Sequence, residues 1–418
     1  MKKVSFAVLG LGNRGWVYAS HALQFPQDME ITAVADIDPA RLQHAAKHLN
    51  LAKEQLFDSA ETLLQQSKLA DVMVVSTQDR QHRDHAIRAM ELGYDLLLEK
   101  PIAADPRDIK AISEVANRLG RRVIVCHVLR YTPFYRAVKK LLQDGIVGRI
   151  MNIEAAEHVG YYHIAHSFVR GNWHKESDSS PMILAKCCHD MDLLLWLTEK
   201  RCRRVSSFGS LSFFKAENRP EGAPKRCTDG CPQEDNCPFH APKFYLSRIP
   251  GWPSNVLHPE PNEENIMEAL RTTNYGRCVF DMDNDVVDHQ VLNMEFEDGI
   301  LASFTMSGFN NIQTRTLRIA GTEGEIWGNF HEKQLHWQCY NEQMHTVDLS
   351  GANTKGHGGG DTGIVLDMIR LYRGDDFDTS SITTLDRSTE SHYLAFAAEE
   401  SRLKGGQLID LDAYISSL

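Results

Sequence analysis

Residues 4–15 read V-S-F-A-V-L-G-L-G-N-R-G, an apolar run that ends in three spaced glycines. Gly10 permits a tight turn, Gly12 lets the backbone approach a pyrophosphate, and Gly15 lets the following helix pack closely on the strand. A second apolar run, I-T-A-V-A-D, ends at Asp36, 21 residues after Gly15. A carboxylate at this position accepts hydrogen bonds from the adenosine ribose and repels a 2′-phosphate. The complete strand–loop–helix–strand unit therefore predicts a dinucleotide site that prefers NAD to NADP.

Composition places the chain among ordinary globular proteins. Its 418 residues are enough for two domains, with 42% hydrophobic and 24% charged residues. The formal net charge of −11 argues against nucleic acid or an anionic membrane as a partner, because phosphate-rich partners attract basic surfaces. No apolar segment is long enough to span a bilayer, so we expect no membrane partner. Nine cysteines without an export signal favour a cytoplasmic protein.

The first part of the chain alternates strand and helix patterns. Apolar runs occur at 4–9, 30–35, 71–76, 94–98 and 122–126, and helical patterns lie between them at 39–48, 59–67, 80–92 and 105–119. This alternation predicts a parallel sheet, covered by helices on both faces, in residues 1–128. Ligands of such sheets bind at the carboxyl ends of the strands.

The pattern changes after residue 133. Strand patterns follow one another with few helices between them, at about 149–158, 203–213, 286–296, 300–309 and 314–320. The sequence E-D-G at 297–299 is a hairpin signal that joins two of these runs. We therefore expect residues 129–418 to form an α+β domain on a largely antiparallel open sheet. Two late helical patterns, at about 361–373 and 385–403, are expected to pack back on the body.

Two segments place basic side chains where a nicotinamide ring is expected. The E-K-P turn at 99–101 follows the run Y-D-L-L-L, so Lys100 lies at a carboxyl strand end. A partly desolvated Lys at such a place can transfer a proton. A helix predicted over residues 181–198 puts Lys186 and His189 one turn apart on one face. We interpret the three basic residues as a catalytic group, although each alone also fits a surface or structural role.

These motifs together resemble the glucose–fructose oxidoreductase, inositol dehydrogenase and rhizopine-catabolism family. The resemblance rests on the N-terminal glycine motif, the E-K-P turn at 99–101 and the H-D-M-D sequence at 189–192. Looser matches are G-T-E-G at 321–324 and G-G-G-D at 358–361. The resemblance implies a Rossmann domain, a C-terminal α/β domain with an open sheet, and bound NAD or NADP. It also implies hydride transfer at a carbon of a sugar or cyclitol.

The chain departs from the family pattern beside the expected catalytic histidine. The resemblance assigns Lys100 and His189 to catalytic positions, and many members carry Asp four residues before that histidine. Here this position is Ala185, and Lys186 follows it. Lys186 could donate to a substrate hydroxyl, stabilise an alkoxide or enolate, or act on Lys100 by like-charge repulsion. The departure puts a simple dehydrogenase proton relay in question.

Further residues are candidates for binding the cofactor or the substrate. The nucleotide loop, the turn after the 71–76 run and the E-K-P turn supply the expected cofactor contacts Asn13, Arg14, Thr77, His82, Glu99 and Lys100. Residues 157–174 are dense in aromatic and polar side chains, a combination that suits carbohydrate. We expect the substrate to contact Arg130, Tyr131, His166, Arg170, Trp173 and His357. The glycine-rich segment around His357 also fits a purely structural turn.

An irregular insertion at about 215–275 carries a cysteine motif. Its spacing is C-x3-C-x5-C-x2-H, formed by Cys227, Cys231, Cys237 and His240. Three thiolates and one imidazole would close a tetrahedral structural zinc site. Free thiols or a disulfide are the alternatives, because the spacing differs from a C-x2-C knuckle.

Three functions remain open on the sequence alone. The first is an NAD-dependent oxidoreductase that acts on a sugar, a sugar derivative or a cyclitol. The second is redox-assisted glycoside hydrolysis, in which a ring hydroxyl is oxidised, the leaving group is eliminated, water adds and the hydride returns. The third is a dinucleotide-binding regulator, which the basic groups near the nicotinamide favour least. We expect a small-molecule carbohydrate substrate and a homo-oligomer, either a dimer or a tetramer.

Overall fold

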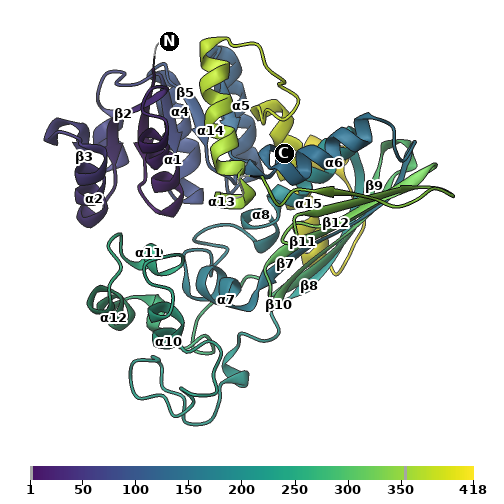
Figure 1. Ribbon diagram of the computed structural model, residues 1–418. Coiled ribbons are helices and arrows are strands. Elements are labelled where there is room, and N and C mark those ends of the chain that lie inside the picture. Colours follow the sequence, from purple (N-terminus) through teal and green to yellow (C-terminus); the bar gives the residue numbers. More distant parts are fainter. Residues whose placement is uncertain (1–2, 353–354) are drawn as a thin grey trace.

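The apolar runs of the N-terminal part form one six-stranded sheet (Figure 1). A computed structural model describes residues 3–352 and 355–418 of the chain. The strands are all parallel and lie in the order β3-β2-β1-β4-β5-β6. Their bounds are β1 Val4–Leu9, β2 Met29–Ala35, β3 Leu56–Phe57, β4 Val72–Val75, β5 Asp95–Leu98 and β6 Val123–Val125. The helices of this part are α1 Asn13–Gln24, α2 Pro39–Leu49, α3 Ala60–Leu64, α4 His82–Glu91 and α5 Pro106–Leu119.

Side chains of this sheet alternate between two cores, as expected for a sheet covered on both faces. Phe6 and Val8 of β1 pack with Tyr18 of α1 on one face, whereas Ala7 and Leu9 pack with residues of α3, α4 and α5 on the other. The order of strands reverses direction between β1 and β4, which is where ligands of such sheets bind. The predicted Rossmann arrangement is therefore confirmed.

The second sheet has nine strands in the order β14-β13-β12-β11-β7-β10-β9-β8-β15. Strands β7 and β10 are parallel and the other neighbours are antiparallel, which confirms a largely antiparallel sheet. The bounds are β7 Ile150–Gly160, β8 Cys202–Ser210, β9 His289–Phe296, β10 Leu301–Asn310, β11 Thr314–Gly321, β12 Gly324–Asn329, β13 Gln334–Cys339, β14 His345–Asp348 and β15 Ile409–Asp410. The predicted hairpin at 297–299 joins β9 to β10.

Helices cover one face of the second sheet and leave the other face open (Figure 1). The helices of this part are α6 Pro133–Gln143, α7 Tyr161–Ile164, α8 Met182–Ala185, α9 Cys188–Thr198, α10 Ala241–Leu246, α11 Ser254–Leu257, α12 Glu263–Thr272, α13 Lys355–Gly358, α14 Gly360–Arg373, α15 Leu385–Leu403 and α16 Leu411–Ser416. The apolar side chains of Phe208, Val291 and Leu301 are about half exposed, at 56%, 44% and 56%. Helix α14 packs instead on α1 and β1, so a segment near the C-terminus completes the packing around the six-stranded parallel sheet. The division of the chain at residue 128 stays a prediction.

The helix predicted over residues 181–198 is interrupted in the middle. Lys186 and Cys187 lie between α8 and α9, with backbone φ angles of −106° and −100°. A continuous helix would use the Ala185 carbonyl to accept an N–H four residues further on. Lys100 Nζ donates to this carbonyl at 2.7 Å instead. The prediction of one continuous helix is therefore wrong, and the break places the Lys186 side chain independently of α9.

The insertion extends away from both sheets, at the bottom of Figure 1, and contains α10, α11 and α12. It has its own small core, formed by Ala241, Phe244, Tyr245, Ile266 and Leu270. Within the part of the chain that the structure describes, no helix is long and apolar enough to cross a membrane.

Candidate active site

The glycine motif forms a cradle at the carboxyl end of β1. Gly10 has a φ of +85°, and a Cβ there would lie 2.6 Å from the Ser76 carbonyl oxygen. A Cβ on Gly15 would lie 1.8 Å from the Gly10 oxygen, so only glycine fits at either position. By contrast, a Cβ on Gly12 would approach nothing closer than Arg41 Nη1 at 3.7 Å. The backbone at Gly12 is therefore open, and the first N–H groups of α1 have no capping side chain.

Asp36 lies at the end of β2 with its carboxylate against this loop. It accepts the backbone N–H of Leu11 at 2.5 Å and that of Asp38 at 2.8 Å, and it is 7% exposed. Arg41 of α2 approaches the same carboxylate at 3.8 Å. The sequence reasoning overlooked Arg41, because it sits on a helical face that carries no motif.

Arg14 and Glu99, both expected to bind the cofactor, bind one another. Arg14 forms ion pairs of 2.7 Å with Glu99 and with Asp361 of α14, and also contacts Tyr18 and His357. Although burial alone would lower the pKa of Arg14, Asp361, Tyr18 and Glu99 hold it well above the ordinary value. Burial would raise the pKa of Glu99, but Arg14 holds it below its ordinary value. This buried network joins the nucleotide loop to the E-K-P turn and α14.

The remaining predicted cofactor contacts differ in their surroundings. His82 is buried, with Nδ1 2.7 Å from the Pro101 oxygen and Nε2 3.1 Å from the Thr77 oxygen, so both ring nitrogens already face backbone. The Thr77 hydroxyl lies 2.9 Å from His85 Nδ1 and is partly exposed. Asn13, half-buried, is the first residue of α1.

Lys100, Lys186 and His189 come together beyond the carboxyl end of β5. The donation from Lys100 Nζ to Ala185 fixes the Lys100 side chain at the break between α8 and α9. Burial, followed by the charges of Lys100, His127 and Arg315, lowers the pKa of His189 well below its ordinary value. His189 therefore carries a neutral imidazole at neutral pH, the form that can accept a proton.

His357 approaches this group from the glycine-rich segment. Its ring centroid is 6.5 Å from that of His189, and its Nδ1 is 3.0 Å from the Asp361 carboxylate. Its side chain is 43% exposed and its φ is +37°. Of the six residues predicted to bind substrate, His357 is the one whose ring lies near His189.

Lys186 is held in a cluster of charges that sequence reasoning missed. Its Nζ lies 3.3 Å from Glu157 Oε1, and Arg315 is 2.6 Å from the other oxygen of Glu157. Arg315 also forks onto Asp190, at 2.7 and 3.1 Å. Burial lowers the pKa of Lys186, although Glu157 opposes this. His163 lies near Lys186, and burial and Lys186 together lower its pKa well below the ordinary value.

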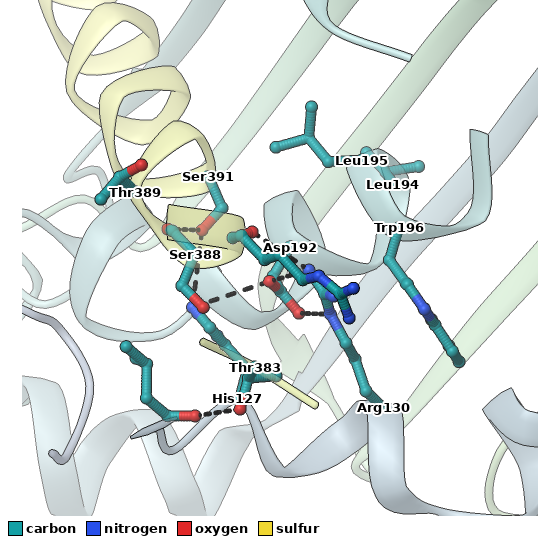
Figure 2. Close-up of polar contacts among 12 residues, drawn as sticks. His127, Arg130, Asp192, Leu194, Leu195, Trp196, Thr383, Ser388, Thr389 and Ser391 are labelled. Carbon is teal, nitrogen blue, oxygen red and sulfur yellow. Dashed lines mark hydrogen bonds and ion pairs between the residues drawn. The ribbon is translucent and has the colours of Figure 1, made fainter. Parts of the chain in front are cut away.

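Arg130 and Tyr131 are parts of the fold, away from any open surface. Arg130 is 3% exposed and forks onto Asp192 of α9 with two bonds of 2.6 Å, as Figure 2 shows. Its guanidinium also lies 5.6 Å from the centre of the Trp196 ring. The Tyr131 hydroxyl is buried 2.9 Å from Thr383 Oγ1, and burial raises its pKa. Their donors are used inside the protein, which leaves the proposed substrate contact without an available group.

His166, Arg170 and Trp173 also make internal contacts. The His166 ring is buried against Tyr245, and burial lowers its pKa to about 3. Arg170 is 2% exposed and donates to the carbonyl oxygens of Arg277 and Phe239. It thereby anchors the insertion. The half-buried Trp173 donates its indole N–H to Asp79 at 3.2 Å.

The structure does not support the predicted zinc site. The motif cysteines line a cavity of only about 10 Å³ together with Cys278 and Arg170. His240 turns its Nε2 to the Cys227 carbonyl oxygen at 3.3 Å, and the Arg170 guanidinium lies 3.6 Å from Cys227 Sγ. Across residues 3–352 and 355–418, no group of three or more His, Cys, Asp or Glu side chains is arranged to hold a metal ion. All nine cysteines are free thiols.

A second, larger cavity is lined in part by residues that neighbour His163 and His357. It has a volume of about 190 Å³ and is lined by Phe134, Gln313, Phe330, His331, Lys333 and Gly358. Gln313 Oε1 lies 2.5 Å from His163 Nδ1, and Gly358 directly follows His357. Aromatic faces beside a few polar groups are typical of sites for small polar organic ligands.

Two family models match the chain. The model described as "Oxidoreductase family, NAD-binding Rossmann fold" matches residues 4–127. The model described as "Oxidoreductase family, C-terminal alpha/beta domain" matches residues 139–355, more than half of the chain. The chain belongs to this oxidoreductase family. The resemblance drawn from the sequence motifs is thus confirmed, and the glycine cradle is that of an NAD-binding Rossmann domain.

Relatives of this oxidoreductase include dehydrogenases. YteT of Bacillus subtilis (strain 168), provisionally named an oxidoreductase, is 25% identical over 392 residues, which cover 88% of each chain. An inositol 2-dehydrogenase/D-chiro-inositol 3-dehydrogenase of Lactiplantibacillus plantarum is 25% identical over 202 residues, or 48% of this chain and 54% of that one. A solved levoglucosan dehydrogenase, in complex with NADH and L-sorbose, shares the fold with a TM-score of 0.72 and 17% identity over 98% of this chain and 99% of that chain.

The residues present fit a dinucleotide. The positive φ at Gly10, the open backbone at Gly12 and the uncapped start of α1 suit a pyrophosphate. The buried Asp36 carboxylate stands at the end of β2, where the adenosine ribose binds in such folds. When bound, the cofactor would supply a hydride acceptor next to the basic group around Lys100.

Proposed function

We propose that this family member is an NAD-dependent oxidoreductase acting on a hydroxyl-bearing carbon of a sugar, a sugar derivative or a cyclitol. The observation that carries the proposal is the convergence of Lys100, Lys186 and His189 beyond the carboxyl end of β5. This is the side of the sheet on which the glycine cradle opens. Family membership and the sugar and inositol dehydrogenases among the relatives support it.

Each basic residue has a distinct part in the proposed reaction. The substrate hydroxyl loses its proton to His189 or Lys100, since the neutral imidazole of His189 can accept one. The ammonium of Lys186 donates a hydrogen bond to the substrate oxygen, which becomes negative as its proton leaves and turns into a carbonyl oxygen as the hydride departs. The hydrogen bond from Lys100 Nζ to the Ala185 carbonyl oxygen orients the Lys100 side chain for its part in the proton transfer. His357 closes the group from the side of α14.

A second candidate is redox-assisted glycoside cleavage, and the cavity that Gln313, the partner of His163, helps to line supports it. Its volume of about 190 Å³ would hold a further unit of a glycoside. In this reaction a ring hydroxyl is oxidised, a base removes the acidified neighbouring C–H proton, and the leaving group departs with its electron pair. Water then adds to the double bond, and the hydride returns to the ring. A dinucleotide-binding regulator is the third and weakest alternative.

The cofactor preference and the assembly belong to the proposal as well. We propose NAD rather than NADP, because the Asp36 carboxylate would repel a 2′-phosphate. We also propose that the protein works in a reducing cytoplasm, where its nine free thiols would persist. The half-exposed Phe208, Val291 and Leu301 on the open sheet face support a homo-oligomer, a dimer or a tetramer, formed through that face.

One experiment separates the two enzyme functions. The protein is incubated with NAD and a panel of sugars, cyclitols and aryl glycosides in deuterated water. NADH accumulation without cleavage supports the dehydrogenase. Release of the aglycone without NADH, with deuterium at the carbon next to the anomeric centre, supports glycoside cleavage. Dinucleotide binding with neither product across a broad panel would favour the regulator.

A further inference from the structure

We infer that Glu157 is the positioning residue that keeps Lys186 a cation pointing into the active site. Glu157 lies on β7 and is completely buried, and among the described residues its ion-pair partners are Lys186 and Arg315. It acts through Lys186 and has no direct contact with the substrate. The inference rests on the proposed function only in taking Lys186 as a substrate contact.

The backbone fixes where this carboxylate stands. Glu157 and Arg315 are direct cross-strand neighbours in the pairing of β7 with β11. Both side chains point to the face of the sheet that carries the helices, as the buried neighbours Ile153 and Leu317 do two or four residues away. A sheet position of this kind leaves a carboxylate little freedom to turn away from its partners.

The charges around Lys186 explain why it needs this partner. Arg315 and Lys100 are cations that each lower the pKa of Lys186, and burial lowers it further. His163, from α7, is neutral, and the thiol of Cys187 is buried beside Lys186 with a pKa raised by burial. Glu157 is thus the principal group that opposes loss of the proton from Lys186.

Asp190 does not replace Glu157 in this role. Its two oxygens accept the Nε and one Nη of Arg315, so its charge is engaged with that guanidinium. With Glu157 present, two cations face two carboxylates inside the protein. Without the charge of Glu157, Lys186 and Arg315 would have the single carboxylate of Asp190 as their counter-charge. The least costly response is that Lys186 loses a proton and becomes a neutral amine.

This pairing decides which chemistry Lys186 performs. A protonated Lys186 donates hydrogen bonds and stabilises negative charge on a substrate oxygen, whereas a neutral amine would act as a base. No described side chain accepts a hydrogen bond from its Nζ in good geometry, and the side chain is 13% exposed, so donors remain for a ligand. Lys186 is then a donor, and proton acceptance falls to the neutral imidazole of His189.

The test measures the ion pair without a substrate. The protein is labelled with acetic anhydride at several pH values, and mass spectrometry follows the Lys186 peptide relative to that of the exposed Lys53. Because only the neutral amine reacts, Glu157→Gln should label Lys186 about tenfold faster than wild type near pH 8. Glu157→Asp, which keeps the charge, should return the rate toward wild type. Glu154→Gln, an exposed carboxylate on the same strand, should leave it unchanged.

Equal Lys186 labelling in wild type and Glu157→Gln would overturn the inference. If Glu157→Gln fails to fold, thermal melts of the double variant Glu157→Gln/Lys186→Met decide instead. Removing both charges should restore the cooperative thermal melt that Glu157→Gln lacks, and a double variant that also fails to fold would contradict the pairing. Failure of the proposed function looks different, because Lys186→Met would then keep full turnover on a substrate while the labelling shift persisted.

Discussion

Helix α9 carries two aspartates that each pair with an arginine, and the two pairs have different surroundings. Asp192 of α9 pairs with Arg130 in two bonds of 2.6 Å, and both side chains are buried. Asp190, two residues earlier, pairs with Arg315, whose guanidinium also binds Glu157. The first pair lies beside Trp196, and its further polar neighbours, His127 and the Arg387 carbonyl oxygen, are also inside the protein (Figure 2). The second continues to Lys186, whose donors are available to a ligand.

The difference separates a structural element from a reactive site. In the Arg130 pair every charge is matched within the fold, so the pair can only hold α9 against its neighbours. In the Arg315 cluster the last cation, Lys186, lies near His163 and Lys100 and keeps donors that no described side chain accepts. A buried charge network therefore indicates a functional site when its last group keeps hydrogen-bond donors that no protein atom accepts.

The largest effect is expected from breaking the Arg130–Asp192 ion pair. Asp192→Asn leaves Arg130 buried without a counter-charge, and such a loss costs about 3–5 kcal/mol in the free energy of unfolding. Asp190→Asn should cost clearly less, because Arg315 keeps Glu157 as a partner. Urea unfolding of both variants measures the two values. Equal losses would remove the distinction between the two pairs.

The second prediction concerns the open cluster. Lys100→Ala and His189→Ala should each lower turnover by about two orders of magnitude or more, the usual scale for lost acid–base catalysis. Lys186→Ala should also be severe, since Ala185 offers no carboxylate in its place. NAD affinity, followed by protein fluorescence, should change little in all three. Arg130→Lys serves as the matched control, because it should alter stability more than turnover.

Sequence reasoning found the fold because glycines, strand alternation and turn signals act locally. Within residues 157–174 it predicted substrate contacts at His166 and Arg170 from the chemistry of their side chains alone. Both are buried in internal contacts, while Glu157 in the same stretch joins Lys186. A usable signal existed: Glu157 occupies an inward position of an alternating strand, where a charge needs a partner. The partner, Arg315, is distant in sequence and was out of reach.

The third prediction concerns acid sensitivity. Burial lowers the pKa of His392 to about 3, and its Nε2 accepts the N–H of Ile102, the residue after the E-K-P turn. The unfolded chain then binds a proton below the ordinary value of about 6.5 that the native state does not bind, so stability falls as the pH drops from there toward 3. At pH 5 this costs about 2 kcal/mol relative to pH 7.

Replacing this histidine should flatten the acid response. His392→Gln should lose less stability between pH 7 and pH 5 than wild type does, even if it is less stable at pH 7. Replacement of the exposed His48 by Gln is the control and should keep the wild-type pH dependence. Urea unfolding at the two pH values measures both. An unchanged pH dependence in His392→Gln would show that other groups carry the acid sensitivity.

The smallest expected effect concerns cofactor choice. Asp36→Ala should weaken NAD binding by about tenfold, because ribose hydrogen bonds are lost, and should narrow the gap to NADP. Arg41 would then keep Asp38 but lose Asp36 as a carboxylate partner. Fluorescence titration with both dinucleotides gives the dissociation constants. Tighter binding of NADP than NAD by the wild-type protein would overturn the assignment.

A crystal structure of the protein with NAD and the best ligand from the carbohydrate panel tests the central claim most directly. The account predicts that a ligand hydroxyl lies within hydrogen-bond distance of Lys186 Nζ and of either Lys100 Nζ or His189 Nε2. It also predicts that the carbon bearing this hydroxyl faces the nicotinamide. A ligand bound elsewhere, with these three side chains out of reach, would contradict the placement of the active site.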